Sequence, residues 1–144
     1  MALSVKEMTK AALAEITALS PVEVRHRLGS LDPVVLIDVR EPEEFERGHL
    51  PGAINIPRGL LEMKADLESP VKDARLSDRG LAVVTYCTGG IGARSALSAQ
   101  VLKRMGFLNA ACLEGGLQAW KTLGGPVELG TPDRPSPAKT PGTV

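Results

Sequence analysis

The feature that most constrains this sequence is a cysteine that follows an apolar run and precedes a glycine-rich segment. Residues 81–84 have the composition of a buried strand, and Cys87 comes shortly after them. Three of the five residues that follow Cys87 are glycines. Glycine adopts positive φ at little cost, so successive backbone N–H groups can turn toward one point. We therefore expect a strand that ends near Cys87 and a tight loop whose amides surround the sulfur.

Residues 95–105 have the pattern of a helix that begins directly after this loop. Apolar residues repeat there at helical spacing, and Gly106 is a typical stop. A helix N-terminus, converging amides and the cation Arg94 all favour the thiolate form of a nearby cysteine. The pattern predicts that Cys87 is reactive. The alternative is that Cys87 only packs as a small apolar residue at the end of a strand.

Composition excludes several classes of function. The chain has 144 residues, 43% of them hydrophobic, which suits one domain with a sizeable core. The 17 Lys and Arg residues balance the 17 Asp and Glu residues without a basic run, so we expect no nucleic-acid partner. No apolar segment approaches the roughly 20 residues that span a bilayer, and the N-terminus lacks a signal-peptide core. We expect a cytoplasmic protein with no membrane partner.

The two cysteines, Cys87 and Cys112, form no CxxC pair. This argues against a disulfide framework and against a metal site of the zinc type. Cys112 could resolve a modified Cys87 only if the two sulfur atoms could meet. Its apolar neighbours favour a buried position on a strand instead.

Strand patterns at residues 34–37, 53–57, 81–84 and 107–113 alternate with helical segments. This alternation predicts an α/β fold, with a central parallel sheet and helices on both faces. Functional sites of such open sheets lie beyond the carboxyl ends of the strands.

Three candidate site residues, Asp38, Arg40 and Cys87, occupy positions at strand ends. We expect residues 1–18 to form an N-terminal helix or arm and 19–127 to form the domain. Residues 128–144 are expected to be a flexible tail, because they are rich in proline and have no periodic apolar face. His26, on a helix predicted after the Ser20 cap, is expected to be a surface or packing residue.

The chain resembles a single-domain rhodanese over about residues 19–127. The segments that carry the resemblance are residues 36–57, with LIDVREPEEF (36–45) followed by GHLPGAINIP (48–57), the Cys87 loop with Arg94-Ser95, MGF (105–107), and LEGG (113–116) with Ala119 and Trp120. Four separated segments in the family's order are more specific than any single motif.

The resemblance implies a rhodanese-like three-layer fold and a sulfurtransferase in which Cys87 carries sulfane sulfur as a persulfide. Thiosulfate is the kind of donor implied, the acceptor is a thiol, cyanide or a protein, and no cofactor is required. The substrate-binding residues implied are Thr88, Gly89, Gly90, Ile91, Gly92, Ala93 and Arg94. Asp38, Arg40 and Ser95 would support them, although Asp38, Arg40 and Glu44 are alternatively structural, as members of ion pairs.

The loop departs from the family pattern in one respect. Arg94 stands seven positions after Cys87, two more than in similar rhodaneses and one more than in phosphatases of related fold. The extra length is expected to move Arg94 away from the sulfur, so that thiosulfate would be a poor donor. Two alternatives stay open: a cysteine-dependent phosphatase or arsenate reductase, and a non-catalytic sulfur-carrier or docking module. The loop itself offers no carboxylic acid for phosphate-ester chemistry.

Overall fold

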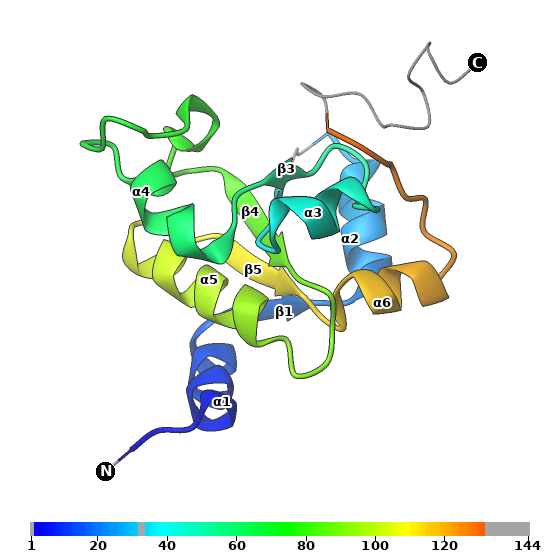
Figure 1. The fold of residues 1–144 in the computed structure, drawn as a ribbon, viewed down its shortest axis with the longest axis horizontal. Helices are drawn as coiled ribbons and strands as arrows, with labels where there is room; N and C mark the ends of the chain where they lie inside the picture. Colours follow the sequence, from blue (N-terminus) through cyan, green and yellow to red (C-terminus); the bar gives the residue numbers. More distant parts are fainter. Residues whose placement is uncertain (1, 32–33, 132–144) are drawn as a thin grey trace.

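The computed structural model describes residues 2–31 and 34–131, and within them five parallel strands form one sheet in the order β1-β5-β4-β2-β3 (Figure 1). The strands are β1 (Thr17–Leu19), β2 (Val34–Asp38), β3 (Ile54–Asn55), β4 (Ala82–Tyr86) and β5 (Ala110–Leu113). The helices are α1 (Val5–Glu15), α2 (Pro21–Leu28), α3 (Pro42–Glu46), α4 (Leu61–Ala65), α5 (Ala93–Arg104) and α6 (Gly116–Thr122), with short 3-10 turns at Arg58–Leu60 and Ala74–Leu76. The predicted α/β fold with a central parallel sheet is confirmed.

The register of the sheet places the candidate site residues at one end of the sheet, where the strands reach their carboxyl ends. Asp38 at the end of β2 pairs with Tyr86 at the end of β4, and Thr85 pairs with Cys112 on β5. Because all the pairings are parallel, the carboxyl ends of the strands meet at this end of the sheet, and Cys87 is the first residue beyond it.

Each face of the sheet is covered by its own apolar core, which gives the three layers. One core joins sheet residues such as Leu36 and Val84 to Val24 on α2, Phe45 on α3 and Trp120 on α6. Trp120 is almost completely buried in this core.

The second core lies on the opposite face of the sheet. It joins Ile37 and Val83 to Leu61 on α4 and Leu102 on α5. Figure 1 shows α4 and α5 on one side of the sheet and α2 and α6 on the other.

Local signals predicted several elements well. Ser20 caps α2, and Glu23 completes the capping box with the Ser20 backbone amide, as the Ser-Pro-x-Glu pattern indicates. His26 is exposed on that helix, as expected. The strand predicted at 107–113 is shorter, since its ladder begins only at Ala110.

The N-terminal segment, predicted to be a helix or an arm, forms the helix α1 and then joins the sheet. Ser4 and Glu7 form a capping box that starts α1, and Ala12 of α1 is fully buried. The chain then enters the sheet as β1, which pairs with β5. The expected boundary at residue 19 therefore falls inside β1. A three-residue edge strand has too short a pattern to be recognised without its neighbour.

The start of the proposed tail also differs from expectation. Glu128 exchanges two backbone hydrogen bonds with His49, at 3.0 and 2.9 Å, and its side chain accepts a hydrogen bond from the Gly52 amide at 2.8 Å. The Gly130 amide donates to the Glu46 carbonyl. Residues 128–131 are therefore tied to the domain, and the rest of the predicted tail, 132–144, lies outside the described residues.

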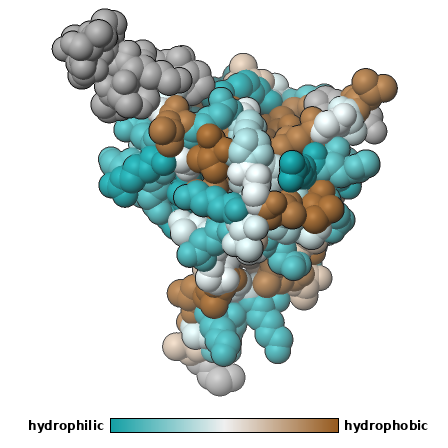
Figure 2. Space-filling view, turned by 90° about the vertical axis from the view of Figure 1, so that its right-hand side faces the viewer, coloured by the Kyte–Doolittle hydropathy of each residue, from teal (hydrophilic) through white to brown (hydrophobic). Residues whose placement is uncertain are grey.

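The surface carries polar and apolar side chains side by side, as Figure 2 shows for one face, where α1 projects at the lower end. Val5, Met8 and Leu13 of α1 are exposed. Within the described residues, no helix combines the length and the hydropathy needed to cross a membrane.

Candidate active site around Cys87

Cys87 is buried at the carboxyl end of β4, with 3% of its surface exposed. Its sulfur lies 3.5 Å from the Ser95 hydroxyl oxygen, to which the thiol donates. The Ser95 hydroxyl in turn donates to the Gly92 carbonyl at 3.2 Å. The Ser95 carbonyl accepts a hydrogen bond from Thr85 at 2.8 Å, which fixes the start of α5 on the sheet. Ser95, expected to support the loop, is thus in contact with the sulfur.

The glycines shape the loop between Cys87 and α5. Gly90 and Gly92 have φ values of 66° and 72°, in the left-handed region, and Gly92 is the N-cap of α5. The backbone amides of Gly89, Gly90 and Ile91 donate no hydrogen bond to any of the described residues. These amides, together with the first turn of α5, are available to an anion. The helix begins two residues earlier than predicted, so Arg94 belongs to its first turn.

The N-terminus of α6 closes the other side of the loop. The Leu117 amide donates to the Cys87 carbonyl at 2.9 Å, and the Gln118 amide donates to the Thr88 carbonyl at 3.0 Å. A Cβ atom on Gly116 would lie 2.5 Å from the Cys87 carbonyl oxygen. Sequence reasoning missed this contact, for which the glycine pair at 115–116 is the available signal.

Arg94 does not stand in the loop as an unpaired cation. Its guanidinium donates to both carboxylate oxygens of Glu44, at 2.8 and 3.3 Å, and to the Thr88 hydroxyl at 3.2 Å. The pair is partly open to solvent, with 41% of Arg94 and 31% of Glu44 exposed. The hydrogen bond from Arg94 lowers the pKa of Glu44 to about 2, assisted by the Glu41 amide and opposed by burial. Hydrogen bonding to Glu44 raises the pKa of Arg94.

The loop itself contains no carboxylic acid, as predicted, but α3 places Glu44 directly beside Arg94. Glu44 is predicted as a possible member of an ion pair, and its partner across the loop could not be identified from local sequence. The two residues are 50 positions apart.

Asp38 and Arg40 form a buried ion pair at the end of β2. The Arg40 guanidinium donates to Asp38 at 2.7 Å and to the Gly48 carbonyl at 2.7 Å, while the Asn55 side chain donates to the Asp38 and Arg40 carbonyls. Asp38 is fully buried and Arg40 is 5% exposed. Because every one of these contacts is internal, the geometry favours the structural role of the pair over direct contact with a substrate.

Cys112 is buried on β5, as expected. Burial, with smaller contributions from Cys87 and Glu114, raises the pKa of its thiol to about 11. Cys112 therefore stays a neutral thiol at physiological pH and is a poor nucleophile.

Away from the Cys87 loop, the described residues form a cavity but no metal centre. A cavity of about 750 Å³ is bounded by Phe45, His49 and the segment 128–131, and its described lining includes no residue of the Cys87 loop. Within the part of the chain that the structure describes, no cluster of three or more His, Cys, Asp or Glu side chains is placed to hold a metal ion.

A parallel α/β sheet with a buried cysteine between a strand end and a helix start defines an α/β domain with a candidate cysteine site. The rhodanese-like domain family matches residues 20–123, and the chain belongs to that family.

Curated relatives of the chain are larger proteins. The probable adenylyltransferase/sulfurtransferase MoeZ of Mycobacterium tuberculosis is 34% identical over 110 residues, which are 76% of this chain and 26% of that protein. A tRNA uridine(34) hydroxylase of Staphylococcus aureus is 40% identical over 102 residues, 71% of this chain and 30% of that protein. The chain thus spans less than a third of these relatives.

Solved structures share the fold. A Rhodopseudomonas palustris protein of unknown function, described as a possible tyrosine phosphatase, is 36% identical with a TM-score of 0.80, covering 89% of this chain and 96% of that one. A thiosulfate sulfurtransferase of Pseudomonas aeruginosa is 26% identical with a TM-score of 0.72, covering 88% of this chain and 23% of that one.

Proposed function

We propose that this domain is a sulfurtransferase in which Cys87 carries sulfane sulfur as a persulfide. The observation that carries the proposal is the position of Cys87, at the end of β4 and before a loop of unpaired amides that leads into the N-terminus of α5. A sulfurtransferase and a thiosulfate sulfurtransferase among the similar proteins support the same chemistry.

The reaction takes place in two steps. The Cys87 thiolate attacks the outer sulfur of a donor, the donor's S–S bond breaks, and its electron pair leaves with the other fragment. With thiosulfate that fragment is sulfite, and the product is Cys–S–S⁻. A thiol or cyanide then attacks the terminal sulfur and releases the Cys87 thiolate. A protein thiol can take the sulfur by the same attack.

The loop supplies stabilisation for the persulfide anion. In this proposal the free amides of Gly89, Gly90 and Ile91 and the first turn of α5 surround the terminal sulfur, while Arg94 stays paired with Glu44 at the rim. Ser95 donates to the sulfur when Cys87 is ionised, since a hydroxyl can rotate from the Gly92 carbonyl toward a stronger acceptor. Asp38 and Arg40 hold the neighbouring strand end in place.

A phosphatase is the second candidate, because the R. palustris neighbour is described as a possible tyrosine phosphatase. Such an enzyme needs an acid that protonates the leaving oxygen. Glu44 is the carboxyl group at the loop, and its pKa of about 2 keeps it ionised at neutral pH. Glu44 is therefore unsuited to that role, and the sulfurtransferase remains the better-supported function.

The test is intact-mass analysis after exposure to a sulfur donor. Wild-type protein is incubated separately with thiosulfate and with the persulfide of 2-mercaptoethanol, and a gain of about 32 Da, one sulfur atom, is expected from at least one of them. Cyanide should remove the added sulfur as thiocyanate. Cys87→Ser should show neither adduct nor turnover, whereas Cys112→Ser, the matched control, should retain both.

Two results would overturn the proposal. One is the absence of an adduct on Cys87 with both donors. The other is hydrolysis of p-nitrophenyl phosphate that is lost in Cys87→Ser, which would favour the phosphatase.

A further inference from the structure

Three arginines at or beyond the carboxyl ends of β2, β3 and β4 are paired with carboxylates. The pairs, with their N–O distances, are Arg40–Asp38 at 2.7 Å, Arg58–Glu62 at 2.8 Å and Arg94–Glu44 at 2.8 Å. An anionic donor that approaches the Cys87 loop therefore meets Arg94 with its charge already balanced.

Arg94 is the arginine that belongs to the loop, and Glu44 holds it from a separate element. The contact is bidentate and includes Thr88, whose hydroxyl lies 3.4 Å from one Glu44 oxygen and 3.2 Å from an Arg94 nitrogen. Bidentate arginine–carboxylate pairs are the strong form of this interaction. Glu44 stays ionised across the physiological range, since its pKa is about 2. The neutralisation of Arg94 is thus a permanent property of the resting site.

Sulfane-sulfur donors differ in what they leave behind. Thiosulfate is a dianion, and after Cys–S⁻ attacks its outer sulfur the S–S bond breaks to give Cys–S–S⁻ and the sulfite dianion. An organic persulfide R–S–S–H reacts with Cys–S⁻ to give Cys–S–S–H and the thiolate R–S⁻, and R can be uncharged. A net positive charge at the rim of the site favours binding of the dianion, whereas an uncharged R group gains nothing from it.

We infer that Glu44 determines donor selectivity, and that the site is suited to organic persulfides rather than to thiosulfate. This inference rests on the proposed sulfurtransferase function and names the donor class for it. Glu44 acts by occupying Arg94, so it is a specificity-determining residue and not a reacting group.

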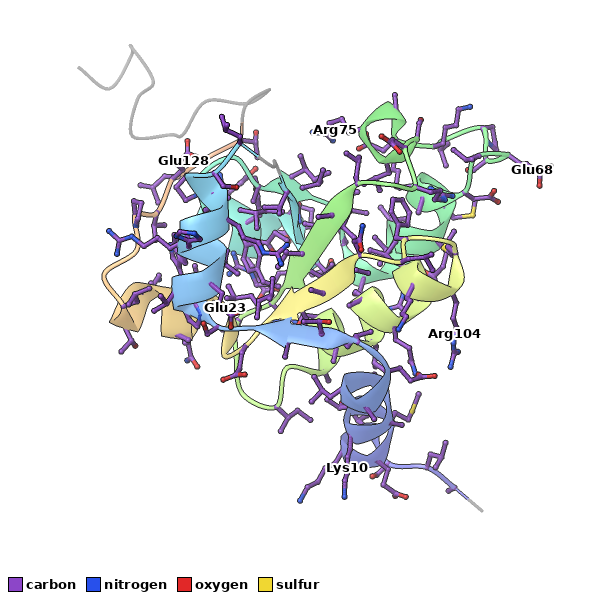
Figure 3. The ribbon with its side chains drawn as sticks, turned by 180° about the vertical axis from the view of Figure 1, so that it is seen from behind. Lys10, Glu23, Glu68, Arg75, Arg104 and Glu128 are labelled. Atoms are coloured by element: carbon purple, nitrogen blue, oxygen red, sulfur yellow. The ribbon has the colours of Figure 1, made fainter. Side chains whose placement is uncertain are left out.

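The experiment compares donors on three variants. Glu44→Gln removes the charge but can still accept from the Glu41 amide, because glutamine also completes a capping box. Glu44→Gln/Arg94→Gln removes both charges. Glu15→Gln is the matched control: it removes a carboxylate from Arg104 at the far end of α5, beside α1 (Figure 3). The rate of Cys87 persulfide formation is measured with thiosulfate and with 2-mercaptoethanol persulfide, followed by cyanide turnover.

Wild type should prefer the organic persulfide by about tenfold in kcat/KM, equivalent to a single well-placed charge interaction. Glu44→Gln should raise kcat/KM for thiosulfate about fivefold, mainly through KM, and the gain should disappear in 1 M NaCl, where charges are screened within about 3 Å. Its rate with the organic persulfide should stay within about twofold of wild type. The double variant should return thiosulfate to the wild-type value, and Glu15→Gln should change neither donor.

The failures are distinguishable. Absence of an adduct with both donors overturns the sulfurtransferase itself. An adduct on Cys87 with equal efficiency from both donors, or no thiosulfate gain in folded Glu44→Gln, overturns the selectivity inference and leaves the function standing. A thiosulfate gain that persists in the double variant also overturns the selectivity inference, because the gain would then not come from an Arg94 freed of Glu44.

Discussion

Glu44 shows how one side chain couples the stability of the site to its electrostatics. It receives hydrogen bonds from Arg94 and from the Glu41 amide, so it stabilises both the contact across the loop and the start of α3. Its pKa is lowered from 4.5 to about 2 on folding. A group whose pKa is depressed in the folded state adds stability above its unfolded value, and that stability is lost as the pH falls toward the folded value.

We therefore expect Glu44→Gln to lower the free energy of unfolding by about 1 kcal/mol at pH 7, a figure discounted for the solvent exposure of the pair. The difference from wild type should be constant above about pH 4.5 and should shrink as the pH falls toward 2. Urea denaturation at pH 7, 4 and 3 measures it. Glu43→Gln, which removes a charge from the same exposed turn, controls for net charge. If the destabilisation by Glu44→Gln is as large at pH 3 as at pH 7, the ionised Glu44 carboxylate is not its source.

At the scale of elements, the loop is held between the starts of two helices. α5 begins at Ala93 directly after the glycines, and α6 donates two backbone hydrogen bonds to the loop from the opposite side. The close approach depends on Gly116, which has φ of 59° and no room for a Cβ atom. The geometry of the Cys87 loop is thus set by a helix that starts almost 30 residues later in the chain.

Gly116→Ala should destabilise the protein by about 3 kcal/mol, from left-handed strain and from overlap with the loop. Gly124→Ala measures the left-handed strain alone, since Gly124 also has positive φ but nothing lies within 4 Å of an added Cβ. It should cost about 1 kcal/mol. Gly116→Ala should also slow persulfide formation on Cys87, whereas Gly124→Ala should not. Equal losses of stability in the two variants would mean that the Cys87 loop can move away from the added Cβ atom without destabilising the protein.

At the scale of the whole molecule, the N-terminal helix and strand complete the domain. β1 covers the edge of β5, and Thr9 and Ala12 are the buried residues of α1, which packs against α5. α1 projects from the body in Figures 1 and 2, yet this contact makes it part of the same structure as α5. Because α5 leads directly from the Cys87 loop, α1 supports the site from a distance.

Ala12→Asp tests this integration, because it places a charge at a fully buried position. We expect one cooperative unfolding transition, with a free energy of unfolding lower by about 3 kcal/mol. Ala11→Asp, at the neighbouring exposed position, should change it by less than about 0.5 kcal/mol. Circular dichroism during urea denaturation measures both. An Ala12→Asp midpoint equal to that of wild type would show that α1 is an independent arm.

Sequence reasoning predicted the elements whose signals are local. The capping box at Ser20, the buried strand that precedes Cys87 and the helix that follows its glycines are encoded within a few residues, so both the fold class and the position of Cys87 could be inferred. Strand and helix types follow from periodicity, which a single segment displays. The reactivity of Cys87 remains a prediction.

Only the tertiary structure decided which distant groups meet. The Glu44–Arg94 pair joins residues 50 positions apart, and the Gly116 contact with the loop joins two elements through backbone atoms that every residue possesses. β1 is too short to display a pattern and exists because β5 offers an edge to pair with. Charge, hydrogen-bonding capacity and strand length were all present in the sequence, but their partners were determined by the packing of the sheet and its helices. The chain thus encodes the position of the Cys87 loop locally, whereas the final geometry of the loop and the charge of the site are set by long-range contacts.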